Sequence, residues 1–353
     1  MTSKLRFGII GCGVIGHIHA KAIATLPDAQ LVAVVDTVLK PAQELMEEFH
    51  VTHYENLQEM LAREHLDIID ICTPSGQHGE HACQVMRSGV NVIVEKPLEI
   101  TRAAIAEMLR VQQETGVKLA VISQHRFDPD TIKVHDLVEA QAFGRLVQGL
   151  ALVPWWRSQA YYDSGAWRGT WELDGGGVLM NQSIHSIDLL QWLMGPVKSI
   201  FAYTDTLVHR METEDVAVAV LRFANGALGT IAATTGAYPG TGTRIELHGD
   251  KGSAVIEDDR LSYLHLAQDD REEVGPYDAA REQHVPTAPA GPSTAQNPAT
   301  LAIRSHALQI EDMIRAIREN GAPLVDGFAA RHPVEIILGI YESARTHQEV
   351  TLS

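Results

Sequence analysis

The first 124 residues alternate short apolar runs with segments in which apolar residues recur at the period of a helix. The runs are nearly continuously apolar, which is typical of parallel strands covered by helices on both faces. Strands are expected at residues 5–10, 31–35, 51–54, 67–72, 91–94 and 118–122, and helices at residues 16–26, 41–49, 57–63, 77–88 and 101–115. Because this alternation has the spacing of βαβ units, residues 1–124 are predicted to form a doubly wound parallel sheet.

The rest of the chain has the pattern of strands joined by turns. Strands are expected at residues 146–153, 200–207, 216–223, 228–234, 244–248 and 254–256, a long loop at residues 268–300, and helices at residues 178–193, 306–319 and 333–346. Asn225-Gly226 is a strong hairpin signal between two of these strands. Residues 125–353 are therefore predicted to form an α/β domain with a large, mostly antiparallel open sheet, for substrate binding and oligomerisation. Its closing helices can also pack back on the first domain.

Two predicted strands, residues 216–223 and 228–234, are apolar on both alternating faces. One face can pack on helices of the same domain, and the other needs a cover that excludes water. A second subunit is the simplest cover, which predicts a homodimer or homotetramer. A cover from within the chain is the alternative.

Composition narrows the class of protein. The 353-residue chain has a formal net charge of −17, which argues against nucleic acid and anionic membranes as partners. No run approaches the ~18 apolar residues of a membrane helix, and the chain enters a core strand without an export signal. The three cysteines form no CxxC pair and are expected to be buried thiols of a reducing cytosol. We therefore expect a cytoplasmic protein.

A glycine-rich segment, residues 11–16, stands between the first predicted strand and helix and reads Gly-Cys-Gly-Val-Ile-Gly. Gly11 allows a tight turn, Gly13 lets the backbone approach a pyrophosphate, and Gly16 lets the helix pack on the sheet. The N–H groups at the start of the helix face the phosphate charge, and Val14 and Ile15 of the loop are also expected to bind the cofactor. The flanking strand and helix favour a dinucleotide-binding Rossmann domain over an ordinary glycine-rich turn.

The second predicted strand ends at Asp36, which bears on the choice of cofactor. A carboxylate there can accept hydrogen bonds from the adenosine ribose hydroxyls and would repel a 2′-phosphate. The first cation after it is Lys40. NAD is therefore favoured over NADP.

Polar segments follow three of the predicted parallel strands: residues 11–16, Thr73-Pro74 with His78, and Glu95-Lys96-Pro97. Ligands bind beyond the carboxyl ends of parallel strands, so these segments are expected to converge at the cofactor. From such a position Lys96 can hydrogen-bond a substrate hydroxyl and stabilise the alkoxide that forms as hydride leaves. A surface lysine is the alternative.

A second cluster follows three glycines, residues 175–177, at the start of the predicted helix 178–193. Asn181, His185 and Asp188 have the i, i+4, i+7 spacing of one helix face. An imidazole flanked by an amide and a carboxylate is a candidate proton acceptor. A structural histidine is the equal alternative.

An aromatic and cationic stretch precedes the glycines and includes Arg157, Tyr162, Trp167 and Arg168. Aromatic faces stack on sugar C–H groups, and arginines bind hydroxyls or carboxylates, although an ordinary packed loop would have the same composition. His17 and His19 face different directions on a helix, and no other ligand pattern occurs, so no metal site is expected.

Together these motifs resemble the glucose-fructose oxidoreductase / inositol dehydrogenase / rhizopine catabolism (Gfo/Idh/MocA) family over essentially the whole chain. The resemblance rests on residues 11–16, Thr73-Pro74 with His78, Glu95-Lys96-Pro97, Arg126-Phe127-Asp128-Pro129, Trp167-Arg168, residues 175–177 and His185-Ser186-Ile187-Asp188. It implies a Rossmann domain, an oligomer-forming open sheet, and hydride transfer between NAD(P) and a sugar, inositol or nucleotide-sugar carbon.

The resemblance also implies roles for single residues. Lys96 and His185 match the catalytic lysine and histidine, and Trp167 and Arg168 match residues that touch the cofactor in some members; Arg126 is placed with the cofactor as well. Many members carry Asp where this chain has Asn181, and an amide cannot accept a proton at neutral pH. Some nucleotide-sugar 3-dehydrogenases of the family also carry Asn there.

We therefore expect an NAD-dependent sugar or polyol dehydrogenase. His185 would accept the hydroxyl proton and Lys96 would stabilise the alkoxide, while Asn181, Asp188, Arg157 and Tyr162 would bind the substrate. Two alternatives remain at this stage, an NAD-recycling redox-assisted glycosidase and a non-catalytic regulator that binds NAD or sugar.

Overall fold

The structure, a computed structural model, describes residues 3–267 and 303–352. These residues divide into two compact units. The first contains residues 3–124, 170–175 and 303–334, and the second contains residues 125–169, 176–267 and 335–352. Two segments from later in the chain thus join the N-terminal unit.

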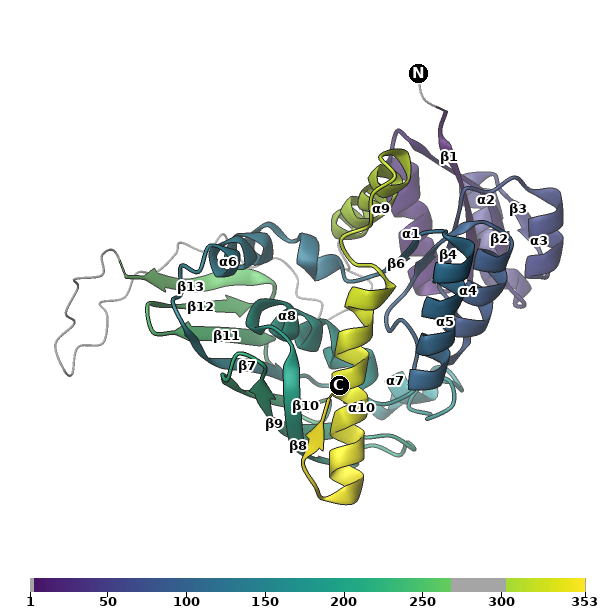
Figure 1. Ribbon diagram of the computed structural model, residues 1–353. Helices are drawn as coiled ribbons and strands as arrows, with labels where there is room; N and C mark the ends of the chain where they lie inside the picture. Colours follow the sequence, from purple (N-terminus) through teal and green to yellow (C-terminus); the bar gives the residue numbers. More distant parts are fainter. Residues whose placement is uncertain (1–2, 268–302, 353) are drawn as a thin grey trace, which may run out of the picture. The chain divides into compact units, whose positions relative to one another are not determined.

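Within its described residues, the first unit has a six-stranded parallel sheet in the order β3-β2-β1-β4-β5-β6 (Figure 1). The strands are β1 (Leu5–Ile10), β2 (Ala29–Val35), β3 (Thr52–Tyr54), β4 (Ile68–Ile71), β5 (Asn91–Val94) and β6 (Leu119–Val121). The connecting helices are α1 (Val14–Thr25), α2 (Leu39–Phe49), α3 (Leu57–Arg63), η1 (Ser75–Gln77) with α4 (His78–Arg87), and α5 (Arg102–Thr115). This order places the carboxyl ends of β1, β4 and β5 side by side.

Helix α9 (Ile303–Arg318) packs on α1 in the same unit (Figure 1). Ile310 and Met313 of α9 belong to one buried apolar cluster with Phe7 of β1 and Ile23 of α1. The apolar stripe of α9 therefore completes the core of the N-terminal unit. Helix α10 (Gly327–Thr346) follows, and its residues up to Val334 also belong to this unit.

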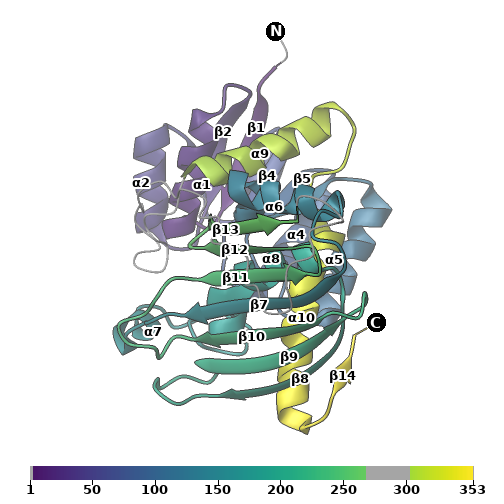
Figure 2. The same cartoon turned by 90° about the vertical axis from the view of Figure 1, so that its left-hand side faces the viewer.

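The described part of the second unit contains an eight-stranded sheet in the order β13-β12-β11-β7-β10-β9-β8-β14 (Figure 2). Its strands are β7 (Leu146–Pro154), β8 (Val197–Asp205), β9 (Val216–Phe223), β10 (Leu228–Thr234), β11 (Arg244–Gly249), β12 (Gly252–Glu257), β13 (Arg260–Leu266) and β14 (Val350–Thr351). Strands β7 and β10 are parallel, and the other pairs are antiparallel. The sheet is therefore mostly antiparallel.

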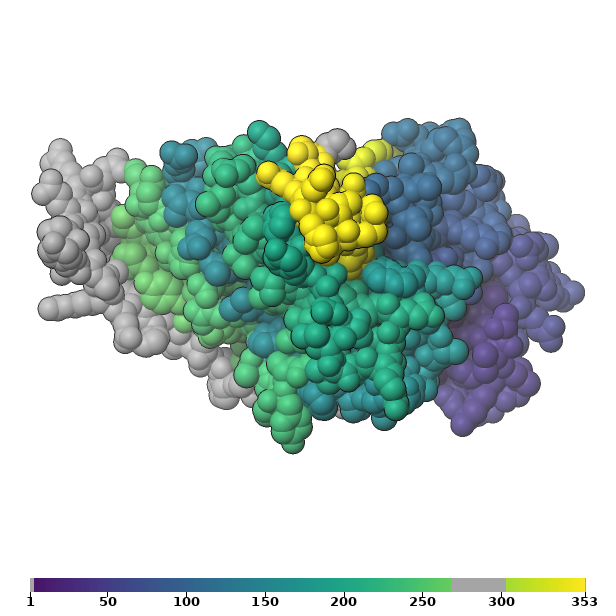
Figure 3. All heavy atoms as spheres, turned by 90° about the horizontal axis from the view of Figure 1, so that it is seen from below, coloured from purple at the N-terminus to yellow at the C-terminus, as the bar shows by residue number. Residues whose placement is uncertain are grey.

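Helices cover one face of this sheet. They are α6 (Pro129–Glu139), the π-helix η3 (Val178–Ser183) and α8 (Ile184–Met194). The short helices η2 (Gln124–Phe127) and α7 (Gln159–Asp163) respectively precede α6 and follow β7 in the sequence. Helix α8 packs on β7 and β11. At the other edge of the sheet, β14 pairs with β8, and in Figure 3 the yellow C-terminal residues lie against teal residues of the same unit. On β9 the side chains alternate, and Val218 and Val220 are 47% and 54% exposed. The predicted oligomer that would cover this face stays a prediction.

The predicted fold class is confirmed in both sheets. The Asn225-Gly226 hairpin is also confirmed, because it joins antiparallel β9 and β10. The prediction of one α-helix over residues 178–193 is wrong for its first six residues, which form the π-helix. Helix α6 and strands β13 and β14 were not predicted, and the predicted loop 268–300 lies outside the described residues. No helix among the described residues is long and apolar enough to cross a membrane.

Candidate functional site

The glycine loop connects β1 with α1 in the first unit. Gly11 has a φ of +93°, and a Cβ there would lie 2.6 Å from the carbonyl oxygen of Cys72. A Cβ on Gly16 would lie 2.1 Å from the carbonyl oxygen of Gly11, so the loop itself requires glycine at both positions. Gly13 has a φ of −68°, and a Cβ there would meet no described atom within 4 Å. The bare backbone at Gly13 is therefore suited to the approach of a ligand.

The start of α1 is suited to an anion. This helix begins at Val14 without a side-chain cap and without an acidic residue in its first turn. Nearby, the Asp36 carboxylate accepts hydrogen bonds from the N–H groups of Cys12 and Val38, each at 2.7 Å. Asp36 is only partly buried, so its remaining lone pairs are available to ribose hydroxyls. The loop thus offers positive backbone dipoles for phosphate and a carboxylate for ribose.

The segments after β1, β4 and β5 converge at one edge of the sheet, as predicted. His78 links two of them, because its Nδ1 lies 2.7 Å from the carbonyl oxygen of Pro97 and its Nε2 lies 2.9 Å from that of Thr73. Burial lowers the pKa of His78. The Oγ1 atom of Thr73 is buried and has no hydrogen-bond partner among the described residues. The cofactor contacts of Thr73, Pro74 and His78 stay predictions. The Thr73 hydroxyl has the free hydrogen-bonding capacity that such a contact requires.

A buried charge network lies under Lys96. His19 is fully buried, with its Nδ1 2.5 Å from Asp70 Oδ2 and its Nε2 2.9 Å from Glu95 Oε1. Because both ring nitrogens face carboxylate oxygens, both carry hydrogens. Burial alone would lower the pKa of His19, but the two carboxylates raise it to about 10.

Glu95 connects this network to the backbone of Lys96 by a hydrogen bond. Although burial alone would raise the pKa of Glu95, the hydrogen bond and charge of His19 hold it well below its usual range. Its Oε2 accepts a hydrogen bond of 2.9 Å from the N–H of Lys96, and His306 Nε2 lies 3.8 Å from Oε1. Glu95 thus holds the segment that carries Lys96. Its predicted contact with the cofactor stays a prediction.

In the second unit, the segment with Asn181 has an unusual helical geometry. Residues 178–183 form a π-helix, in which backbone hydrogen bonds span five residues instead of four. Asn181 belongs to this π-helix and His185 to the α-helix that follows it, so their predicted common face stays a prediction. His185 and Asp188 lie on α8, where the i, i+3 relation holds. Single π-helical turns are frequent at functional sites.

Close packing explains two of the glycines before this π-helix. A Cβ on Gly176 would lie 2.0 Å from the Tyr341 hydroxyl, and one on Gly177 would lie 1.9 Å from the carbonyl oxygen of Glu214. The Glu214 carboxylate accepts hydrogen bonds from the N–H groups of Gly177 and Leu179 and from the Tyr341 hydroxyl, at 2.9–3.0 Å. Burial raises the pKa of Glu214 to about 7 despite these donors. The glycines thus let a buried carboxylate hold the start of the helix.

Arg126 and Asp188 form a bidentate ion pair, with Nε and Nη2 donating at 2.8 and 2.5 Å. Both residues are about 3% exposed, and the guanidinium also lies over the Trp192 ring. The pair fixes α8 to η2 within the second unit. The predicted cofactor contact of Arg126 and substrate contact of Asp188 stay predictions, since the two groups meet each other here.

His185, the predicted proton acceptor, is partly exposed on α8. Its ring makes an edge contact with His125, at a centroid distance of 5.1 Å. The Nδ1 of His125 lies 2.8 Å from Asp128 Oδ2 and 3.2 Å from Asp259 Oδ1. Burial alone would lower the pKa of His125, but the charges of Asp259 and Asp128 raise it to about 9. A second imidazole, held by two carboxylates, therefore stands beside His185.

The aromatic stretch of the second unit gathers around Tyr161, a member of the stretch for which no role was predicted. The guanidinium of Arg168 lies over the rings of Tyr161 and Trp167, at 4.4 and 4.5 Å from their centroids. Arg157, which is 7% exposed, lies over Tyr161 and Trp155 at 5.5 and 4.8 Å. Burial lowers the pKa of Arg157. The predicted roles of Arg157, Trp167 and Arg168 stay predictions.

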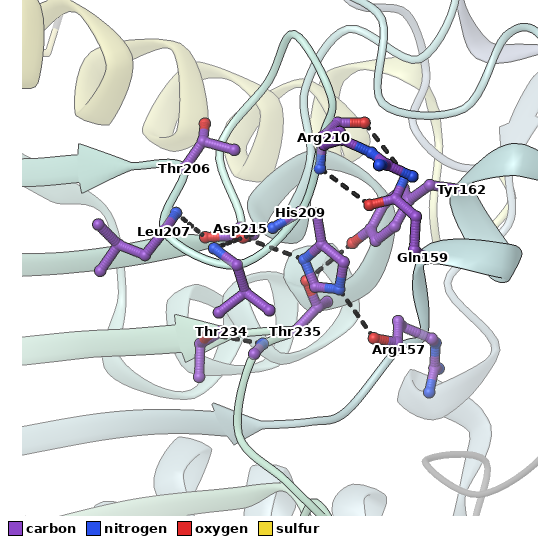
Figure 4. Close-up of polar contacts among 12 residues, drawn as sticks. Arg157, Gln159, Tyr162, Thr206, Leu207, His209, Arg210, Asp215, Thr234 and Thr235 are labelled. Atoms are coloured by element: carbon purple, nitrogen blue, oxygen red, sulfur yellow. Dashed lines mark hydrogen bonds and ion pairs between the residues drawn. The ribbon is translucent and has the colours of Figure 1, made fainter.

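A clamp built from residues 206–215 holds the backbone of Arg157 (Figure 4). The Asp215 carboxylate accepts hydrogen bonds of 2.8 Å from three successive N–H groups, those of Leu207, Val208 and His209. The His209 ring lies between this carboxylate and the Arg157 carbonyl oxygen, at 3.0 and 2.8 Å. The adjoining Tyr162 hydroxyl is buried 2.7 Å from Thr235 Oγ1. Tyr162, predicted to bind substrate, thus uses its hydroxyl inside the unit.

Potential metal ligands also cluster among the described residues. The three groups are His19-Asp70-Cys72, His19-Glu95-His306 and His125-Asp128-Asp259. His19 and His125 are already ion-paired with carboxylates of the same groups, so the geometry is that of charge networks. We assign no metal to them.

Comparison with known proteins agrees with this geometry. Residues 5–123 match the family described as "Oxidoreductase family, NAD-binding Rossmann fold", and residues 131–255 match the "GFO/IDH/MocA C-terminal domain". Inositol 2-dehydrogenase of Rhizobium meliloti is 29% identical over 75% of this chain and 79% of its own. D-glucoside 3-dehydrogenase of Escherichia coli is 32% identical over 58% of each chain.

Among solved structures, the chain is similar to the WlbA dehydrogenase of Bordetella pertussis, determined in complex with NADH and UDP-GlcNAcA. The two share 33% sequence identity over 99% of each chain, with a TM-score of 0.86. Both units of the fold are therefore covered by one relative.

Proposed function

The chain belongs to the Gfo/Idh/MocA family of oxidoreductases, and from this premise we propose that it is an NAD-dependent dehydrogenase of a sugar, polyol or nucleotide sugar. The proposed reaction removes a hydride from one carbinol carbon and a proton from its hydroxyl. The observation that carries the proposal is that the glycine loop and Lys96 follow the carboxyl ends of β1 and β5, the two strands that flank β4 in the first unit. Named relatives that act on inositol and on D-glucosides support this substrate class.

The residues of the first unit fit NAD. The open space at Gly13 and the uncapped start of α1 suit a pyrophosphate, and the partly exposed carboxylate of Asp36 suits ribose hydroxyls and opposes a 2′-phosphate. The buried hydroxyl of Thr73, at the same edge of the sheet, can form a hydrogen bond with the cofactor. When bound, NAD supplies the acceptor for the hydride.

Two side chains are proposed to carry the proton chemistry. A ring nitrogen of His185 accepts the proton of the substrate hydroxyl, because a neutral imidazole is a base near pH 7. The ammonium group of Lys96 donates a hydrogen bond to the same oxygen and stabilises the negative charge that develops there. The Glu95 network fixes the backbone from which the Lys96 side chain extends. Asn181 and Arg157 are proposed to orient the sugar.

The experiment is a measurement of NADH absorbance after mixing the protein and NAD with myo-inositol, methyl D-glucoside or UDP-GlcNAcA. The proposal predicts NADH formation with one of these classes and little with NADP. Release of an aglycone from a nitrophenyl glycoside without free NADH would instead support the redox-assisted glycosidase. NAD binding without any turnover would support a regulator, and absence of NAD binding would refute the proposal.

A further inference from the structure

The phenolic oxygen of Tyr161 receives hydrogen bonds from two side-chain nitrogens that can only donate. Arg168 Nη1 lies 2.7 Å from it, and Gln182 Nε2 lies 2.8 Å from it. A guanidinium has no acceptor, and an amide nitrogen has none either. Both lone pairs of the phenolic oxygen are therefore used in accepting.

The hydrogen of this hydroxyl is then left for a third partner. A phenol has one hydrogen to donate and two lone pairs, and the two neighbours occupy the lone pairs. The side chain of Arg157, a further cation, also lies against the Tyr161 ring. Among residues 3–267 and 303–352, the Tyr161 hydroxyl donates no hydrogen bond. Since Tyr161 is only partly buried, an acceptor can reach it from outside the protein.

The neighbouring Tyr162 shows the contrast. Its side chain is 6% exposed, and its hydroxyl pairs with Thr235 Oγ1 at 2.7 Å, a group that can both donate and accept. The two tyrosines are adjacent in sequence, and their rings meet edge to face at 5.1 Å. One hydroxyl is thus satisfied in the core, whereas the other is set up to donate.

Gln182 connects Tyr161 with the residues proposed to bind substrate. Its Nε2 donates both to Tyr161 and, at 3.0 Å, to Asn181 Oδ1. It belongs to the π-helix that continues into α8, which carries His185. A single amide therefore orients the Tyr161 hydroxyl and the Asn181 carboxamide together.

We infer that Tyr161 is a substrate-binding residue whose hydroxyl donates a hydrogen bond to an oxygen of the sugar. The inference rests on the proposed function and deepens it, because it names a donor that recognises one hydroxyl, carbonyl or carboxylate oxygen of the substrate. Arg168 and Gln182 act as positioning residues, since they hold the phenolic oxygen so that its hydrogen points to the ligand. The Tyr161 hydroxyl takes no part in the transfer of the proton or the hydride.

The test compares Tyr161→Phe with Tyr162→Phe. Each substitution removes one hydroxyl and keeps the ring, and Tyr162→Phe removes the more deeply buried of the two hydroxyls. For Tyr161→Phe we expect KM to rise roughly 3- to 10-fold for the turned-over probe among myo-inositol, methyl D-glucoside and UDP-GlcNAcA, with kcat nearly constant. For Tyr162→Phe we expect an unchanged KM and a lower melting temperature, because Thr235 loses a buried partner.

Monodeoxy analogues of that probe provide the second measurement. Wild-type protein should lose affinity when the accepting hydroxyl is removed, and Tyr161→Phe should be indifferent to this one change while it still discriminates at the other positions. Absence of such coupling at every position, or an unchanged KM in Tyr161→Phe, would overturn the inference and leave the proposed function intact.

Failure of the proposed function would look different. If wild-type protein forms no NADH with any of the three probes, calorimetric binding of the same probes in the presence of NADH takes the place of KM. Weaker binding by Tyr161→Phe alone would support the role of its hydroxyl. No binding of any probe to the wild type would overturn both proposals.

Discussion

Replacement of His19 by glutamine gives a quantitative test of the charge network under Lys96. Folded His19 keeps its second proton to about pH 10, whereas an unfolded histidine releases it near pH 6.5. In this window the unfolded state binds one proton fewer than the folded state, so the free energy of unfolding falls as pH rises. The stabilisation is complete below pH 6.5 and disappears as pH approaches 10.

The expected size follows from the same shift. One proton corresponds to about 1.4 kcal/mol per pH unit, so His19 accounts for a loss of roughly 3 kcal/mol between about pH 6.5 and 8.5. Breaking a buried ion pair on one side costs about 3–5 kcal/mol, which is of the same order. His19→Gln should therefore be destabilised most at about pH 6.5, and the gap to the wild type should narrow as pH rises.

The assay is urea unfolding at several pH values between about 6.5 and 8.5, where cysteines that begin to ionise in the unfolded state affect the wild type and the variant equally. His17→Gln is the matched control, because His17 lies on the same helix and its side chain is partly exposed near Glu44. The control should keep the pH slope of the wild type. Equal slopes for the wild type and His19→Gln would refute the assignment of a buried imidazolium.

Three further predictions concern other parts of the two units. Asp36→Ala should weaken NADH binding by about tenfold or more, because a charged acceptor for the ribose hydroxyls is lost. Cofactor fluorescence should also show a smaller preference for NADH over NADPH, and an unchanged preference would contradict the proposed role of Asp36. In the wild type, the free energy of unfolding should fall as pH rises from about 4.5 to 7, because the folded Glu214 carboxyl keeps its proton to about pH 7 and the unfolded one does not. Glu214→Gln should lack this fall in denaturant unfolding, and identical pH profiles of variant and wild type would contradict the raised pKa of Glu214. Asp188→Asn should cost about 3–5 kcal/mol in denaturant unfolding, because it leaves the Arg126 charge buried, and a loss below 1 kcal/mol would show that the pair is unimportant.

Local patterns in the sequence were sufficient for the first unit. The glycine loop and the apolar strands depend on neighbours within a few residues, and their predicted positions agree with β1, α1 and β5. The charge network was not predictable in this way, because His19 meets carboxylates 51 and 76 residues further along the chain. Only the order of β1, β4 and β5 brings these groups together.

The second unit shows a different limit. Sequence spacing suggested one continuous helix over residues 178–193, but its first six residues form a π-helix. A buried carboxylate at Glu214 and the close approach of Tyr341 to the glycines accompany this π-helix. Spacing also could not decide between Tyr161 and Tyr162. Their hydroxyls differ because Thr235 and Gln182, which are distant from the tyrosines in sequence, meet one hydroxyl each. Adjacent aromatic and cationic residues indicated that a binding site was present. This pattern did not indicate which of these residues faces the ligand.

The most direct test of the central claim is the turnover of Lys96→Ala with NAD and the substrate that the probe measurement identifies. Removal of a donor that stabilises the developing alkoxide should lower kcat by about 10²–10³-fold. NAD affinity, measured in parallel, should change little, because the glycine loop and Asp36 remain. This combination would support a hydride transfer assisted by Lys96, and an unchanged kcat would contradict it.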